Sequence, residues 1–174
     1  HEAVAIGYLE RFVADWARSH GSADEEKPAA NGIKVAVVGS GPAGLAFAGD
    51  MAKRGYSVTV YEALHEIGGV LKYGIPEVRL PNAIVDTEID GLRRLGVEFE
   101  ANCIVGKTLS YDDLHAMGFK GIFVASGAGL PRFMNISGEN LNGVMSSNEF
   151  LTRVNLMGAA GQDEDTPVLH GHNV

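Results

Sequence analysis

Cysteine is nearly absent from this chain, and so are long hydrophobic runs and an excess of positive charge. Cys103 is the single cysteine among 174 residues, which excludes an internal disulfide and a cysteine metal cluster within this chain. No apolar run approaches the roughly 20 residues that span a bilayer, and no secretory signal is visible. The formal net charge of −8 argues against nucleic acid or an anionic membrane surface as a partner. We expect a cytoplasmic protein in a reducing compartment.

The chain does contain an ordinary globular composition, with 45% hydrophobic and 21% charged residues. Its length suffices for one hydrophobic core. Apolar strands alternate with helices, which predicts an α/β fold with a mainly parallel sheet. The expected strands are 34–38, 57–61, 97–101, 104–105 and 121–124, and the expected helices are 43–54, 82–95 and a short one opened by a capping box at 110–113. Residues 97–101 and 104–105 could pair as a hairpin, and 68–81 is predicted as an ordered loop.

The N-terminal segment 1–31 has a different pattern from the rest. Residues 3–18 are predicted to form an amphipathic helix, whose apolar positions are Ile6, Leu9, Phe12, Val13 and Trp16. We expect this stripe to face a hydrophobic core. Residues 19–32 are small, polar and turn-forming, which is typical of an exposed linker. The chain therefore divides into a helix with its linker, 1–31, and an α/β domain, 32–174.

A glycine fingerprint follows the first predicted strand. Gly39 permits a tight turn, Gly41 lets the backbone approach a pyrophosphate, and Gly44 allows close contact between helix and strand. The helix that begins near Pro42 directs its N–H groups and the positive end of its dipole toward phosphates. Glu62 ends the second strand, where its carboxylate can accept hydrogen bonds from a ribose. Together these features predict an adenine-dinucleotide site.

The fingerprint alone does not distinguish FAD from NAD. Two later features favour FAD: the doublet Gly68-Gly69, where bare backbone can lie along an extended ligand, and the turn at Gly127, which ends a later strand. A nicotinamide-binding Rossmann dehydrogenase domain and a non-catalytic assembly module remain alternatives. No side chain shows the base and orienting partner of an activated nucleophile, so no catalytic residue is assigned. His170 and His172 alternate in the C-terminal tail without a cysteine nearby, and no metal site is assigned.

The loop that begins at the doublet carries a narrower signature. Gly68-Gly-Val-Leu-Lys-Tyr-Gly-Ile-Pro-Glu-Val-Arg-Leu-Pro81 resembles the small (β) subunit family of glutamate synthase. It is also similar to the large subunit of the electron-bifurcating ferredoxin–NADP oxidoreductase and to the FAD module of dihydropyrimidine dehydrogenase. The segments 127–133, 137–141 and 147–153 extend the resemblance, which covers the chain from about Ile6 to about Gly158.

This resemblance implies a Rossmann-like FAD-binding domain preceded by a short helical segment. The cofactor-binding residues it implies are Gly39, Gly41, Pro42, Ala43, Gly44, Glu62, Gly69, Val70, Leu71, Arg79, Val105 and Gly127. In this assignment the turn holds the pyrophosphate, Glu62 the ribose, and Val105 the adenine end. Val70 and Leu71 line the flavin side, and Arg79 pairs with the phosphates.

The resemblance also implies a larger enzyme. Relatives carry cysteine motifs for iron–sulfur clusters before the segment similar to Ile6–Trp16, and an NADPH fingerprint after the segment similar to 166–174. Neither occurs here, so 1–31 is expected to end an iron–sulfur domain and 32–174 to lack the NADP domain. NADPH would reduce the flavin, and electrons would leave through iron–sulfur centres. A glutamate synthase large subunit or a ferredoxin-type carrier would be the partner.

Overall fold

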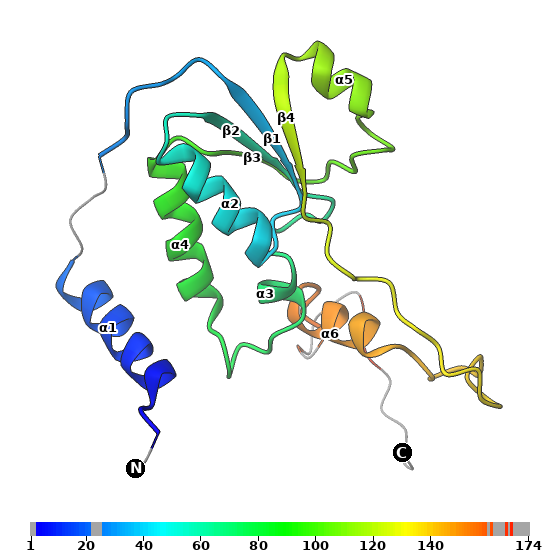
Figure 1. Ribbon diagram of the computed structural model, residues 1–174. Coiled ribbons are helices and arrows are strands. Elements are labelled where there is room, and N and C mark those ends of the chain that lie inside the picture. Colours follow the sequence, from blue (N-terminus) through cyan, green and yellow to red (C-terminus); the bar gives the residue numbers. More distant parts are fainter. Residues whose placement is uncertain (1–2, 22–25, 160, 162–165, 167, 169–174) are drawn as a thin grey trace.

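The structure, a computed structural model, describes residues 3–21, 26–159, 161, 166 and 168 (Figure 1). Its centre is a sheet of four strands in the order β3-β2-β1-β4, and every pair is parallel. The strands are β1 (Lys34–Val38), β2 (Ser57–Tyr61), β3 (Glu98–Glu100) and β4 (Phe119–Val124). The predicted α/β fold with a parallel sheet is confirmed, and β1 and β2 have the predicted bounds.

Helices pack on both faces of the sheet because both faces of strand β1 are apolar. Val37 of β1 belongs to a core with Ala48 of α2 (Pro42–Ala52) and Val97, which follows α4 (Asn82–Arg94). Its neighbour Ala36 points the other way and packs with Leu114 of α5 (Tyr111–Ala116). Figure 1 shows α2 and α4 along one face, with α5 beside β4. Near-continuous apolar strands are typical of parallel sheets that are buried on both sides.

The connections place a crevice at one end of the sheet. The chain moves from β1 outward through β2 to β3, and then crosses back to add β4 on the other side of β1. In an open parallel sheet, ligands bind outside the carboxyl ends of the strands, where the strand order reverses. The turns that follow β1 and β4 meet at this point: the N–H of Ala125 donates to the carbonyl oxygen of Val38.

A short helix, α3 (Val70–Tyr73), interrupts the segment predicted as a loop, and a buried lysine fixes it to α4. The side chain of Lys72 is 9% exposed, and its Nζ lies 2.6 Å from Asp86 Oδ1 and 2.9 Å from Glu66 Oε2. Burial alone would lower the pKa of the Lys72 ammonium. The hydrogen bonds to Asp86 and Glu66 outweigh burial and raise this pKa above its ordinary value.

Two further predictions on local structure have clear outcomes. The capping box at Ser110 is confirmed, since its side chain accepts from the N–H of Asp113 and the Asp113 carboxylate accepts from the N–H of Ser110. The possible hairpin of 97–101 with 104–105 is wrong. β3 pairs in parallel with β2, and Val105 forms only an isolated bridge with Leu109. The apolar alternation predicted strands there but carried no information on their partners.

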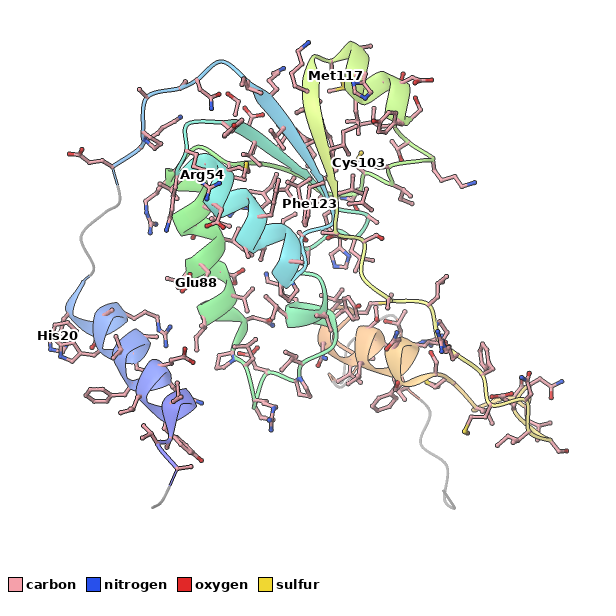
Figure 2. The ribbon with its side chains drawn as sticks, in the orientation of Figure 1. His20, Arg54, Glu88, Cys103, Met117 and Phe123 are labelled. Carbon is pink, nitrogen blue, oxygen red and sulfur yellow. The ribbon has the colours of Figure 1, made fainter. Side chains whose placement is uncertain are left out.

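The first helix, α1 (Ile6–His20), stands apart from the sheet (Figures 1 and 2). None of its residues is buried, and Phe12 and Trp16 are 67% and 53% exposed. The helix itself is confirmed, but the expectation that its stripe faces a core is wrong within the part of the chain that the structure describes. Helical spacing of apolar residues predicts an amphipathic helix without naming the surface that covers it. Among the described residues, no helix has the length and apolar character to cross a membrane.

Candidate cofactor site

A cavity of about 1020 Å³ opens at the carboxyl ends of β1, β2 and β4. This volume lies at the upper end of the range for small-molecule sites. Nine of the twelve residues predicted from the sequence line this cavity: Gly39, Gly41, Pro42, Ala43, Glu62, Gly69, Val70, Val105 and Gly127. The fold therefore brings together residues that lie up to 88 positions apart in the sequence, counted from Gly39 to Gly127.

The other three predicted residues lie outside the cavity lining. Gly44 is buried at the interface between α2 and β1, and Leu71 packs against a small core that contains Leu45 and Ile89. Arg79 is exposed, and its backbone N–H donates to the carbonyl oxygen of Pro76. The pairing of Arg79 with phosphates stays a prediction.

Three glycines allow segments to approach closely: Gly39 in the β1–α2 turn, Gly44 in α2 and Gly69 in the doublet before α3. Gly39 has φ of +104°, and a side chain there would collide with the carbonyl of Ala125. A Cβ on Gly44 would collide with the carbonyl oxygen of Gly39, so α2 can pack this closely against the turn only because position 44 is glycine. Gly69 has φ of +55°, and a Cβ there would come within 2.8 Å of Gly41 Cα. These contacts match the close approach that the sequence pattern predicts.

The remaining glycine of the turn, Gly41, has a different environment. A Cβ on Gly41 would meet no atom within 4 Å, because this position faces the cavity. Gly41 is also the N-cap of α2, and no side chain caps this end of the helix. The first N–H groups of an α-helix have no partner within the helix and carry a partial positive charge. An open backbone cradle of this kind fits the diphosphate of a dinucleotide.

The predicted ribose ligand, Glu62, is held in place by a buried network. Its Oε2 accepts from the N–H of Ser40 at 2.9 Å and from the Ser40 hydroxyl, and its Oε1 accepts from the N–H of Leu64 at 3.0 Å. The Ser40 hydroxyl in turn accepts from the N–H of Gly68 at 2.9 Å. A carboxylate has about four acceptor positions, so Glu62 keeps capacity for a ligand hydroxyl at the cavity wall.

Sequence reasoning missed the role of Ser40. This side chain is fully buried, and it joins the phosphate turn, the acid of β2 and the glycine doublet. A serine between two glycines is expected in any turn, so this local pattern does not indicate the contact. The signal lies only in the three-dimensional approach of residues 40, 62 and 68.

The opposite wall of the cavity comes from α6 (Ser147–Asn155), a helix that was not predicted. Its lining residues are Ser146, Asn148, Glu149, Thr152 and Arg153. Ser146 caps the helix, since its hydroxyl accepts from the N–H of Glu149 at 3.1 Å. The pattern Ser-x-x-Glu at 146–149 is a capping-box signature that could have located the start of α6.

Two amide side chains fix α6 to the rest of the site. Asn155 Nδ2 donates to the carbonyl oxygen of Tyr73 at 2.9 Å, which joins α6 to α3. Asn148 Nδ2 donates to the carbonyl oxygen of Gly129 at 2.8 Å, which joins α6 to the segment after β4. The cavity therefore lies between a wall of bare backbone and a wall of side chains.

Two ionisable groups of the lining have raised pKa values. Burial, with a contribution from Glu100, raises the pKa of the Cys103 thiol. Burial also raises the pKa of Tyr61, followed by the nearby Cys103, Glu100 and Glu98. Both groups therefore stay protonated and neutral near neutral pH.

In the described chain, no group of three or more His, Cys, Asp or Glu side chains could hold a metal ion. His170 and His172 lie outside the described residues.

Comparison with known proteins shows the family to which this chain belongs. Residues 33–163 match the model of the family described as pyridine nucleotide-disulphide oxidoreductase, and the chain belongs to this family. Two solved structures share the fold. FprA of Mycobacterium tuberculosis in complex with NADPH is 23% identical, with a TM-score of 0.60 over 70% of this chain and 28% of that chain. A 2-naphthoyl-CoA reductase is 27% identical, with a TM-score of 0.57 over 72% of this chain and 19% of that chain.

Curated relatives confirm the resemblance seen in the loop signature. The glutamate synthase [NADPH] small chain of M. tuberculosis is 39% identical over 88% of this chain and 32% of the relative. The NAD-dependent dihydropyrimidine dehydrogenase subunit PreT of Escherichia coli O157:H7 is 38% identical over 75% of this chain and 32% of the relative. The NADP(+)-dependent formate dehydrogenase subunit beta of Moorella thermoacetica is 36% identical over 89% of this chain and 25% of the relative. The chain thus spans between a quarter and a third of the length of these relatives.

Proposed function

We propose that this chain is the FAD-binding part of an NAD(P)H-dependent electron-transfer flavoprotein of the glutamate synthase small-subunit type. The observation that carries the proposal is one cavity lined jointly by the open turn at Gly41, by Glu62, by Gly69 and by Gly127. Each contributes what one part of an adenine dinucleotide requires: a diphosphate cradle, a ribose acceptor, and bare backbone along an extended ligand. The 39% identity to a glutamate synthase small chain supports the assignment.

In this proposal FAD supplies the hydride and electron transfer, and the residues of this chain bind and orient it. The α2 N-terminus and Gly41 hold the diphosphate, and Glu62 holds the adenosine ribose. Val105 lies at the adenine end, while Val70 lies on the side of the flavin. Gly44, Leu71 and Ser40 keep these groups in position from outside the cavity.

The whole protein would take electrons from NADPH and pass them through iron–sulfur centres to a partner in the cytoplasm. The names of relatives support a partner, because two of them are subunits of a formate dehydrogenase and a dihydropyrimidine dehydrogenase. A glutamate synthase large subunit or a ferredoxin-type carrier is the proposed partner. We assign 1–31 to the end of an iron–sulfur domain, and the exposed apolar stripe of α1 supports this division.

Substitution of Gly41 tests the proposal directly. In the full-length protein, Gly41→Val places two methyl groups in the diphosphate cradle, and the affinity for FAD is expected to fall by about 100-fold, or about 2.7 kcal/mol. Gly121→Val is the matched control, because a Cβ on Gly121 also meets nothing within 4 Å and Gly121 does not line the cavity. Titration with FAD, followed by flavin fluorescence, measures both. Unchanged FAD binding in Gly41→Val would refute the assignment of the turn.

A nicotinamide-only Rossmann domain is the second candidate, because the family takes its name from pyridine nucleotides. The two candidates differ in the visible spectrum of the purified full-length protein. A flavoprotein retains flavin absorbance after mild purification, whereas a nicotinamide domain lacks it and is protected from thermal unfolding by NADH. An assembly module would show neither property.

A further inference from the structure

Arg153 is the one cationic side chain among the described residues that line the cavity. The lining also contains two carboxylates, Glu62 and Glu149. FAD carries two negative charges on its diphosphate, and two nearby carboxylates disfavour such a ligand unless a cation offsets them. The backbone cradle at Gly41 offers N–H groups and a partial helix charge, but no full positive charge.

The helix that carries Arg153 is connected to the phosphate turn through α3. Asn155, two residues after Arg153, donates a hydrogen bond to the carbonyl oxygen of Tyr73 at the end of α3. The N-cap of α3 is Gly69, which lies directly against Gly41 Cα. Figure 1 shows α6 beside α3, on the side of the site away from α5. The helix α6, and with it the backbone of Arg153, is therefore held relative to the cradle by packing against α3 and by this hydrogen bond.

Arg153 also retains the capacity to bind an anion. Its Nη2 lies 2.8 Å from Glu149 Oε1, one turn earlier on the same helix, and its side chain is 38% exposed. A guanidinium has five N–H donors in a planar fork, so one contact with Glu149 leaves donors for a bidentate pair with phosphate oxygens. Both residues line the cavity.

We infer that Arg153 pairs with the diphosphate of the bound dinucleotide and supplies the cation that the backbone cradle lacks. The inference rests on the proposed function, since it assumes that FAD occupies this cavity. It adds Arg153 to the phosphate contact that the loop signature implies for Arg79, and the Arg79 contact stays a prediction. Arg79 is exposed and does not line the cavity.

Binding of FAD and of ADP to the full-length protein tests the inference, because ADP contains the diphosphate but no flavin. Arg153→Gln is expected to weaken both ligands by about 10- to 100-fold, the range for a charge-assisted hydrogen bond. It should also flatten the decrease in affinity with rising salt. Arg153→Lys keeps the charge and should recover part of the loss. Arg54→Gln, two residues after the C-terminal end of α2 and outside the cavity lining, is the matched control and should change neither ligand (Figure 2). Isothermal titration gives the affinities, and circular dichroism verifies the fold of each variant.

Two results would overturn the inference: Arg153→Gln leaves both affinities unchanged, or it weakens FAD without weakening ADP. In the first case, a loss of both ligands in Arg79→Gln would assign the phosphate contact to Arg79 alone. The second result would place Arg153 at the flavin rather than at the diphosphate. Failure of the proposed function is recognised separately, because Gly41→Val would then leave FAD binding unchanged in a protein with intact Arg153.

Discussion

The two walls of the cavity are built on different principles. The wall at the β1–α2 turn is backbone, and its glycines are required because a Cβ would collide with main-chain atoms or protrude into the cavity. The wall at α6 consists of side chains, and other residue types could stand at these positions without a main-chain clash. They are Ser146, Asn148, Glu149, Thr152 and Arg153. In the proposed function, the first wall would bind the diphosphate and ribose that all adenine dinucleotides share, whereas the side chains of the second wall would adjust charge and affinity for one ligand. The backbone wall is therefore expected to tolerate almost no substitution, and the α6 wall many.

The largest contrast is expected between Gly44, which lies behind the backbone wall, and Gly41, which lines the cavity. Gly44→Ala forces a Cβ against the carbonyl oxygen of Gly39, which should destabilise the fold by about 3 kcal/mol. Gly41→Ala adds the same methyl group in open space, so its stability should change by less than about 0.5 kcal/mol while FAD binding weakens. Urea denaturation measures the first effect and FAD titration the second. Equal loss of stability in both variants would show that the two glycines do not have separate roles.

A smaller loss is expected where a side chain supports the backbone wall. Ser40→Ala removes the hydroxyl that donates to Glu62 and accepts from the N–H of Gly68, and leaves this N–H buried without that partner. The expected cost is about 2 kcal/mol in the free energy of unfolding. Ser57→Ala is the control, since Ser57 is exposed at the start of β2. Denaturation that fails to separate these two serines would contradict the role assigned to the buried network.

The smallest effect is expected in the wall of side chains. Ser146→Ala removes the N-cap of α6 and should destabilise this helix by about 1 kcal/mol, with little effect on the sheet. Ser147→Ala changes the adjacent exposed residue and keeps the cap. Hydrogen exchange should show faster opening confined to α6 in Ser146→Ala alone. A loss spread over β1 and β2 would mean that the two walls do not open independently.

The same difference explains what could be predicted from the sequence. β1, β2, α2, α4 and most of the backbone wall were predicted because strand and helix periodicity and obligatory glycines are local properties. The α6 wall and Ser40 were missed because their roles depend on contacts between distant segments, such as Asn155 with Tyr73. The core-facing expectation for α1 was wrong for a related reason. A local pattern indicates that a face is apolar and says nothing of what lies against it.

The ion pairs of Lys72 give the loop between the two walls an unusual dependence on solution conditions. The ammonium is buried, so salt screens its pairs with Asp86 and Glu66 less than it screens exposed charges. Because its folded-state pKa is raised, its stabilisation is complete below the ordinary lysine pKa and is lost only as pH rises through the higher folded value. The glycine doublet beside Lys72 is thus expected to keep its geometry in mild alkali, where the Lys72 ammonium stays charged. High salt, by contrast, is expected to weaken a phosphate contact made by the half-exposed Arg153 before it weakens the ion pairs of Lys72.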